Sequence, residues 1–170
     1  MNRPYNLMRT GRESSRLKNW DYSRKGFYFV TICTKDREEL FGEIDRREMV
    51  LNGYGKTVRE IICGLSSNFD MFLDCFVVMP NHVHFVVFLR GGAIHESPVQ
   101  KRSELSKLVG YLKMNVSKKI HLLGYKGEIW QRNYYDRVVR NGRELEKIRR
   151  YIINNPGMWY RDRNNLEIER

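Results

Sequence analysis

Two histidines stand two residues apart in the segment Pro80-Asn81-His82-Val83-His84-Phe85. The residues from His82 to Leu89 are mostly β-branched or aromatic, which predicts a β-strand. Side chains at positions i and i+2 of a strand point to the same side. His82 and His84 are therefore expected on one face, where two imidazoles can hold one divalent metal ion. A purely structural role is the commoner alternative for such a pair.

A second pair, Tyr151 and Asn155, lies in a predicted helix over residues 143–155. Residues four apart share one face of a helix. A phenol can act as a nucleophile, and an amide oxygen can be a metal ligand. The alternative is that the tyrosine only packs against the core and that Asn155, which precedes Pro156, only ends the helix.

The regular elements that must position these pairs follow from hydrophobic periodicity. The sequence predicts a short hairpin or irregular pairing within 40–51 and β-strands over 26–34, 72–79, 82–89 and 128–139. It predicts helices over 53–66, from Ser103 to before Gly124, and over 143–155, with Asn52 as an N-cap. The fold class expected from this order is α/β (α+β), an antiparallel sheet with helices packed on it. The strand at 82–89 is apolar on both sides, which is typical of the middle of a sheet.

The length of 170 residues favours a single domain. We expect a basic N-terminal arm over 1–25, a core over 26–160 and a polar tail over 161–170, with a flexible loop at 90–102. No run of 18 apolar residues is present, so no transmembrane helix is expected. The first residues lack the apolar stretch of a signal peptide, so the expected location is the cytoplasm.

The charge balance indicates a polyanionic partner. Thirty-one Lys and Arg residues against 20 Asp and Glu residues leave a net charge of +11, with an isoelectric point near 9.7. Such an excess favours nucleic acid first and an acidic membrane second. The alternative is an ordinary solvated surface.

Three ordered blocks of the chain together resemble a known family. Met79-Pro80-Asn81-His82-Val83-His84-Phe85-Val86-Val87 resembles the HUH motif of the tyrosine transposases that act on single-stranded DNA. The other similar blocks are 19–34 in the N-terminal part and 130–140 with 151–156 in the C-terminal part. The closest branch is the REP-associated tyrosine transposases, relatives of the smallest insertion-sequence transposases. The resemblance spans roughly residues 15–160.

This resemblance implies a ferredoxin-like or RRM-like HUH nuclease fold and the cleavage and rejoining of single-stranded DNA by transesterification. It implies that Tyr151 is the nucleophile and that His82 and His84 bind a divalent metal ion, Mg²⁺ or Mn²⁺. Asn155 is implied as the third ligand, whereas Val83 is implied to pack away from the site.

The partner implied by the resemblance is single-stranded or hairpin DNA, with REP-like repeats as the substrate, and not a membrane. A monomer is favoured over a homodimer. The candidate DNA contacts are all basic, and they are Arg9, Arg12, Arg16, Lys18, Arg132, Arg137 and Arg140.

Two other functions stay open. A metal-dependent phosphodiesterase would use the histidines to activate water and would leave Tyr151 as a packing residue. A non-catalytic module would only hold single-stranded nucleic acid. The transposase hypothesis is preferred because all four chemical positions, His82, His84, Tyr151 and Asn155, are present together.

Overall fold

The structure is a computed structural model, which describes residues 22, 24–91 and 103–166. The arm residues Arg9, Arg12, Arg16 and Lys18 lie outside these ranges, as does most of the loop predicted at 90–102.

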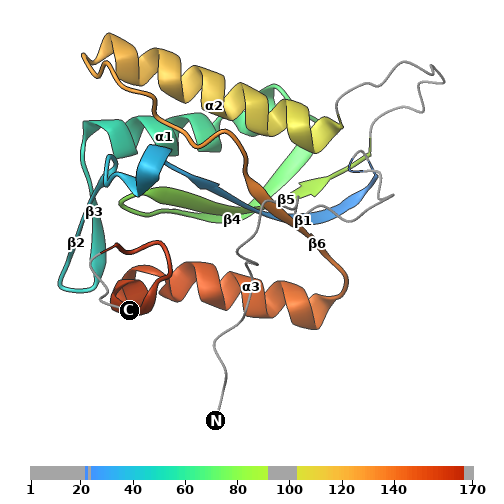
Figure 1. Cartoon of the computed structure of the whole chain (residues 1–170). Helices are drawn as coiled ribbons and strands as arrows, with labels where there is room; N and C mark the ends of the chain where they lie inside the picture. Colours follow the sequence, from blue (N-terminus) through green and yellow to red (C-terminus); the bar gives the residue numbers. More distant parts are fainter. Residues whose placement is uncertain (1–21, 23, 92–102, 167–170) are drawn as a thin grey trace.

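A four-stranded sheet forms the centre of the described part (Figure 1). Every neighbouring pair is antiparallel, and the strand order is β4-β5-β1-β6. The strands are β1 (Gly26–Cys33), β4 (Met71–Val78), β5 (His82–Leu89) and β6 (Tyr135–Val139). The predicted short hairpin is confirmed as β2 (Gly42–Asp45) and β3 (Glu48–Leu51). β5 lies between two partners, as its apolar character predicted.

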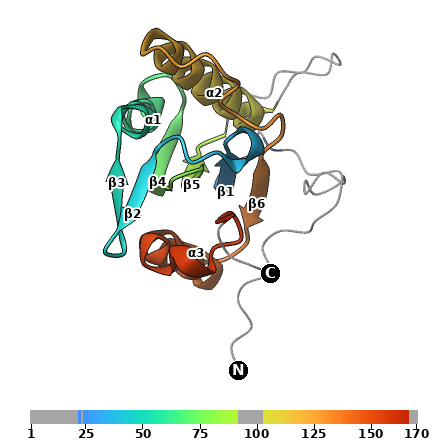
Figure 2. The same ribbon diagram turned by 60° about the vertical axis from the view of Figure 1, so that its left-hand side comes forward.

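Helices cover both faces of the sheet (Figures 1 and 2). α1 (Gly53–Cys63) and α2 (Glu104–Leu122) lie on one face, and α3 (Gly142–Asn154) lies on the other. Each helix begins with a polar N-cap whose side chain accepts from a backbone N–H three residues on: Asn52, Ser103 and Asn141. Three short 3₁₀ helices complete the described elements, η1 (Lys35–Arg37), η2 (Leu65–Ser67) and η3 (Pro156–Arg161).

Alternation along β5 divides its side chains between two environments. Val83, Phe85 and Val87 enter the large apolar core beneath α1 and α2. His82 and His84 face the α3 side, where a smaller apolar cluster surrounds Val86. The prediction that Val83 packs away from the histidines is confirmed.

The strand predicted over 128–139 is wrong in its first half, because only Tyr135–Val139 is a strand. Before it, Trp130 makes a single bridge with Thr34. The carbonyls of residues 131, 132 and 133 accept hydrogen bonds from the Lys113 ammonium at 2.7, 3.2 and 3.2 Å. These carbonyls therefore point to a side chain of α2 and not to a neighbouring strand.

The segment predicted as a polar tail, 161–170, is described as far as residue 166, and this part packs against the rest of the protein. Asp162 and Asn164 are buried there, and so is Trp159 just before it in η3. Within the described residues no helix is both long and apolar enough to cross a membrane.

Candidate metal and nucleophile site

His82 has a fixed hydrogen-bonding partner on one side of its ring. The Asn81 amide nitrogen donates to the carbonyls of Arg37 at 3.0 Å and Asn164 at 2.7 Å. The Asn81 Oδ1, 2.9 Å from His82 Nδ1, is then an acceptor, so Nδ1 carries the proton. The lone pair consequently lies on Nε2, which is buried and has no hydrogen-bond partner among the described residues.

His84 is held in the same manner. Its Nδ1 lies 2.7 Å from the hydroxyl of Thr31, the residue opposite it on β1. Its Nε2 lies 3.2 Å from the Tyr151 hydroxyl, and the two histidine rings are 4.4 Å apart. Metal-ligating histidines characteristically bind a fixed partner through one nitrogen and the ion through the other.

Burial keeps both imidazoles uncharged. It lowers the pKa of His82 to about 3, and the positive charge of Arg37 adds to this effect. Burial also lowers the pKa of His84 well below its usual range, with a further contribution from His82. Neutral imidazole is the form that binds metal ions, so no proton needs to leave at neutral pH.

Tyr151 lies in α3, and Asn155 is the C-cap residue directly after this helix. The Tyr151 ring lies edge-on to Phe29 and 5.2 Å from the His84 ring. Burial raises the Tyr151 pKa, as does the negative charge of Asp162, while a hydrogen bond with Asn155 opposes the rise. Asn155 is buried, and its Oδ1 has no hydrogen-bond partner within the described part of the chain.

An ion pair holds α3 against the sheet. The Arg149 guanidinium donates from Nε to Asp74 Oδ2 at 2.8 Å and from Nη2 to Oδ1 at 2.5 Å. This two-pronged contact joins α3 to β4 and fixes the orientation of the helix that carries Tyr151.

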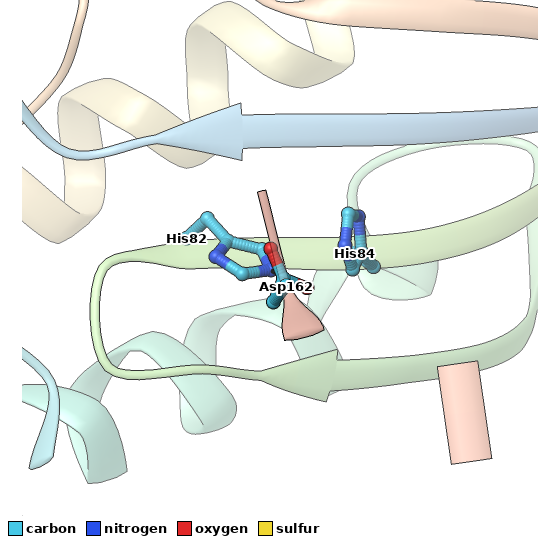
Figure 3. A group of neighbouring side chains, drawn as sticks. All are labelled: His82, His84 and Asp162. Atoms are coloured by element: carbon cyan, nitrogen blue, oxygen red, sulfur yellow. Dashed lines mark ion pairs between the residues drawn. The ribbon is translucent and has the colours of Figure 1, made fainter. Parts of the chain in front are cut away.

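The sequence analysis missed one member of the cluster, Asp162, which follows η3. One ligand atom from each of His82, His84 and Asp162 lies within 4.8 Å of the other two (Figure 3). No local motif marks Asp162. The weak sign available was Trp159, a large aromatic residue in an otherwise polar segment, which indicates that the segment packs.

The residues present fit a divalent metal ion. His82 Nε2 and Asn155 Oδ1 are buried acceptors without hydrogen-bond partners among the described residues, which is costly unless a cation satisfies them. Two imidazoles and an amide oxygen together form a mixed nitrogen and oxygen donor set that can hold a divalent cation.

Three of the basic residues predicted to touch DNA lie in the described part of the chain. Arg132 and Arg140 are exposed. Arg137 forms an ion pair with Glu144 at the start of α3, and its side chain is 42% exposed. The contact of these residues with DNA stays a prediction.

Comparison with known proteins identifies the family. The model of the family described as "Transposase IS200 like" matches residues 24–155, most of the chain. The chain belongs to the IS200-like transposases. His82, His84, Tyr151 and Asn155 all lie inside the matched segment, whereas Asp162 lies beyond its end.

Two similar proteins accompany this assignment of the transposase family. A Haemophilus influenzae protein described as uncharacterised is 33% identical over 177 residues, covering 95% of this chain and 97% of its own length. A solved structure of a REP-associated tyrosine transposase bound to a REP hairpin has a TM-score of 0.60 and 21% identity. That match covers 85% of this chain and 73% of the other, and it supports the fold.

Proposed function

We propose that this IS200-like transposase cleaves and rejoins single-stranded DNA through a covalent bond to Tyr151, with the help of a divalent metal ion. The observation that carries the proposal is the contact between the Tyr151 hydroxyl and the buried His84 of the same chain at 3.2 Å. The nucleophile Tyr151 and the two histidines proposed to bind the metal ion come from one chain. This supports an active site that a monomer can form without a second copy of the protein.

The proposed substrate is single-stranded DNA that folds into a hairpin of the REP type. The net charge of +11 favours a nucleic-acid partner. The similar solved transposase is bound to a REP hairpin, which supports extending this substrate class to the present chain.

The reaction exchanges one phosphate ester for another. Tyr151 Oη attacks phosphorus, an Oη–P bond forms, and the bond from phosphorus to one sugar oxygen breaks. That oxygen takes up a proton and leaves as a hydroxyl, and the phenolic proton lost from Oη to the solvent balances this uptake. The ester energy stays in the phosphotyrosine, so a DNA hydroxyl can later reverse the step and join strands.

The metal ion, Mg²⁺ or Mn²⁺ on His82, His84 and Asn155, would supply positive charge to the scissile phosphate. When His84 is ligated, its Nε2 lone pair no longer accepts the Tyr151 hydroxyl. This leaves Oη free to face the phosphate. The hydrogen bond seen in the structure and ligation of His84 are therefore alternatives.

A metal-dependent phosphodiesterase is the second candidate, and one observation favours it. Burial raises the pKa of Tyr151, which makes its phenolate harder to form than that of an exposed tyrosine and leaves water as a competing nucleophile. A non-catalytic binding module has less support, because two buried neutral histidines with an unpaired Nε2 bring no advantage to simple binding.

A denaturing gel with labelled hairpin DNA tests the proposal. The oligonucleotide is a single strand from the repeats that flank the gene, incubated with Mg²⁺, Mn²⁺ or EDTA. We compare the wild type with Tyr151→Phe and, as a matched control, Tyr160→Phe, which alters a half-exposed tyrosine of η3.

The expected result is a protein–DNA adduct that survives denaturant, requires metal, persists in Tyr160→Phe and is absent in Tyr151→Phe. Cleavage without an adduct, unchanged by Tyr151→Phe, would assign the hydrolase instead. Binding of the hairpin with no cleavage under any metal condition would assign the binding module.

A further inference from the structure

Asp162 is anchored so that one of its oxygens faces the histidines. The backbone N–H of Asn164 donates to Asp162 Oδ1 at 2.7 Å and fixes the rotation of the carboxylate. Two side chains from other segments bind the backbone next to Asp162. The Asn81 side chain, just before β5, donates to the Asn164 carbonyl, and the Arg37 side chain, in η1, donates to the Arg163 carbonyl, both at 2.7 Å. Oδ2 is left as the oxygen turned toward His82.

Two hydrogen-bond acceptors, His82 Nε2 and Asp162 Oδ2, face each other. Asn81 fixes the proton of His82 on Nδ1, so Nε2 presents a lone pair to Asp162 Oδ2 at 3.9 Å. That distance is too long for a hydrogen bond. A buried carboxylate opposite a lone pair is unfavourable unless a positive charge lies between them.

The spacing suits two ligands of one metal ion. Ligands at about 2.1 Å from an octahedral ion are separated by about 3.0 Å when adjacent and about 4.2 Å when opposite. The 3.9 Å between His82 Nε2 and Asp162 Oδ2 lies inside that range. Figure 3 shows the Asp162 side chain next to the His82 ring, with His84 farther along the same strand.

We infer that Asp162 is a ligand of the same divalent ion as His82 and His84, and that the ion fastens the segment 156–165 to the sheet. This inference rests on the proposed function, because it assumes the metal site described there. Among the proposed ligands Asp162 is the carboxylate, so it contributes a full negative charge where the imidazoles and the Asn155 amide contribute none. It therefore has a large share in the affinity for the ion.

Calorimetric titration of the metal-free protein with Mn²⁺ tests the inference without any DNA. We compare the wild type with Asp162→Asn, which keeps the shape of the side chain and an oxygen that can accept the hydrogen bond from the backbone N–H of Asn164. Asp70→Asn is the matched control, because it removes the same charge from an exposed residue beside Arg90, at the other end of β4 and β5. His82→Ala reports on the metal site itself.

We expect Asp162→Asn to weaken Mn²⁺ binding by at least about tenfold, while Asp70→Asn binds as the wild type does. Binding that is unchanged in Asp162→Asn but lost in His82→Ala would overturn the role of Asp162 and leave the metal site standing. Binding that is unchanged in His82→Ala as well would overturn the metal site of the proposed function.

A measurement on the wild type avoids any dependence on how the variants fold. Crystals grown with Mn²⁺ are measured for anomalous scattering, and the expected peak lies within coordination distance of Asp162 Oδ2 and both Nε2 atoms. A peak on the histidines with Asp162 turned away would overturn the inference. As a second readout, trypsin cleavage after Arg161 and Arg163 should slow several-fold with Mn²⁺, and equal rates would contradict the fastening of this segment.

Discussion

On its α1/α2 side the central sheet receives Val83, Phe85 and Val87 from β5, and on its α3 side it receives His82 and His84 from the same strand. The first side belongs to a large continuous core of buried apolar residues. The second has a much smaller apolar cluster beside buried polar groups. Period-two alternation along one strand is enough to produce both environments.

The large apolar core and the proposed chemical site thus lie on opposite faces of the sheet. Apolar burial on the α1/α2 side stabilises the fold, and that stability offsets the cost of neutral, buried and partly unpaired polar atoms on the α3 side. Substitutions on the two sides of the sheet should therefore have different kinds of effect. Changes beneath α1 and α2 should lower the free energy of unfolding, and changes beneath α3 should mainly alter metal binding and DNA chemistry.

Phe85→Ala should give the largest loss of stability, because Phe85 is fully buried in the larger core. We expect the free energy of unfolding to fall by about 3–5 kcal/mol, measured by urea denaturation. Val50→Ala, at a half-exposed position of β3, is the control and should change it by less than about 0.5 kcal/mol. A loss below about 1 kcal/mol for Phe85→Ala would contradict the assignment of stability to this side.

Acid should destabilise the metal-free protein through His82 and His84, on the α3 side of the sheet. The pKa of His82 is about 3 in the folded protein and near 6.5 when unfolded, so between these values the unfolded chain binds more protons. The free energy of unfolding then falls with falling pH, by up to about 1.4 kcal/mol per pH unit for each such histidine. Melting temperatures measured in EDTA from pH 7 to pH 4 check this, and His82→Asn should flatten the slope. An equal slope in the variant would refute the role of His82.

Arg149→Met should have an intermediate effect, because it leaves the Asp74 carboxylate without its guanidinium partner. The side chain of Asp74 is only 5% exposed. We expect a loss of about 1–3 kcal/mol in urea denaturation and less adduct formation, since α3 is held less firmly. Arg150→Met is the control, because its side chain is 75% exposed and it pairs with Glu146 at 3.7 Å. Equal effects of the two variants would mean that the contact with Asp74 does not hold α3.

Tyr151→Phe should have the smallest effect on stability although it abolishes the adduct. It removes one hydroxyl, which makes a 3.2 Å hydrogen bond to His84, and keeps the ring against Phe29. The expected change in urea denaturation is below about 1 kcal/mol. A loss above about 2 kcal/mol would instead identify Tyr151 as a packing residue.

Much of the fold could be predicted from the sequence, because its main elements have strong local patterns. β5 follows from its run of β-branched and aromatic residues, and the start of α1 follows from Asn52. The error at 128–134 has a physical cause. Aromatic composition there resembles a strand, and residues 129 and 131 do make backbone hydrogen bonds with Lys35 and Cys33. The pairing goes no further because the ammonium of Lys113, from a different element, binds the carbonyls of residues 131, 132 and 133.

Local backbone geometry alone places His82 and His84 on one face of a strand and Tyr151 and Asn155 on one side of a helix, so the amino-acid sequence is enough to predict both relations. The meeting of the two faces, with Tyr151 against His84, depends on how α3 packs on the sheet. The tertiary structure also decides that Asn81 sets the proton on His82 and holds Asn164, 83 residues away, which brings Asp162 to the site. These contacts join distant segments through packing of the whole chain, and no spacing within either segment encodes them.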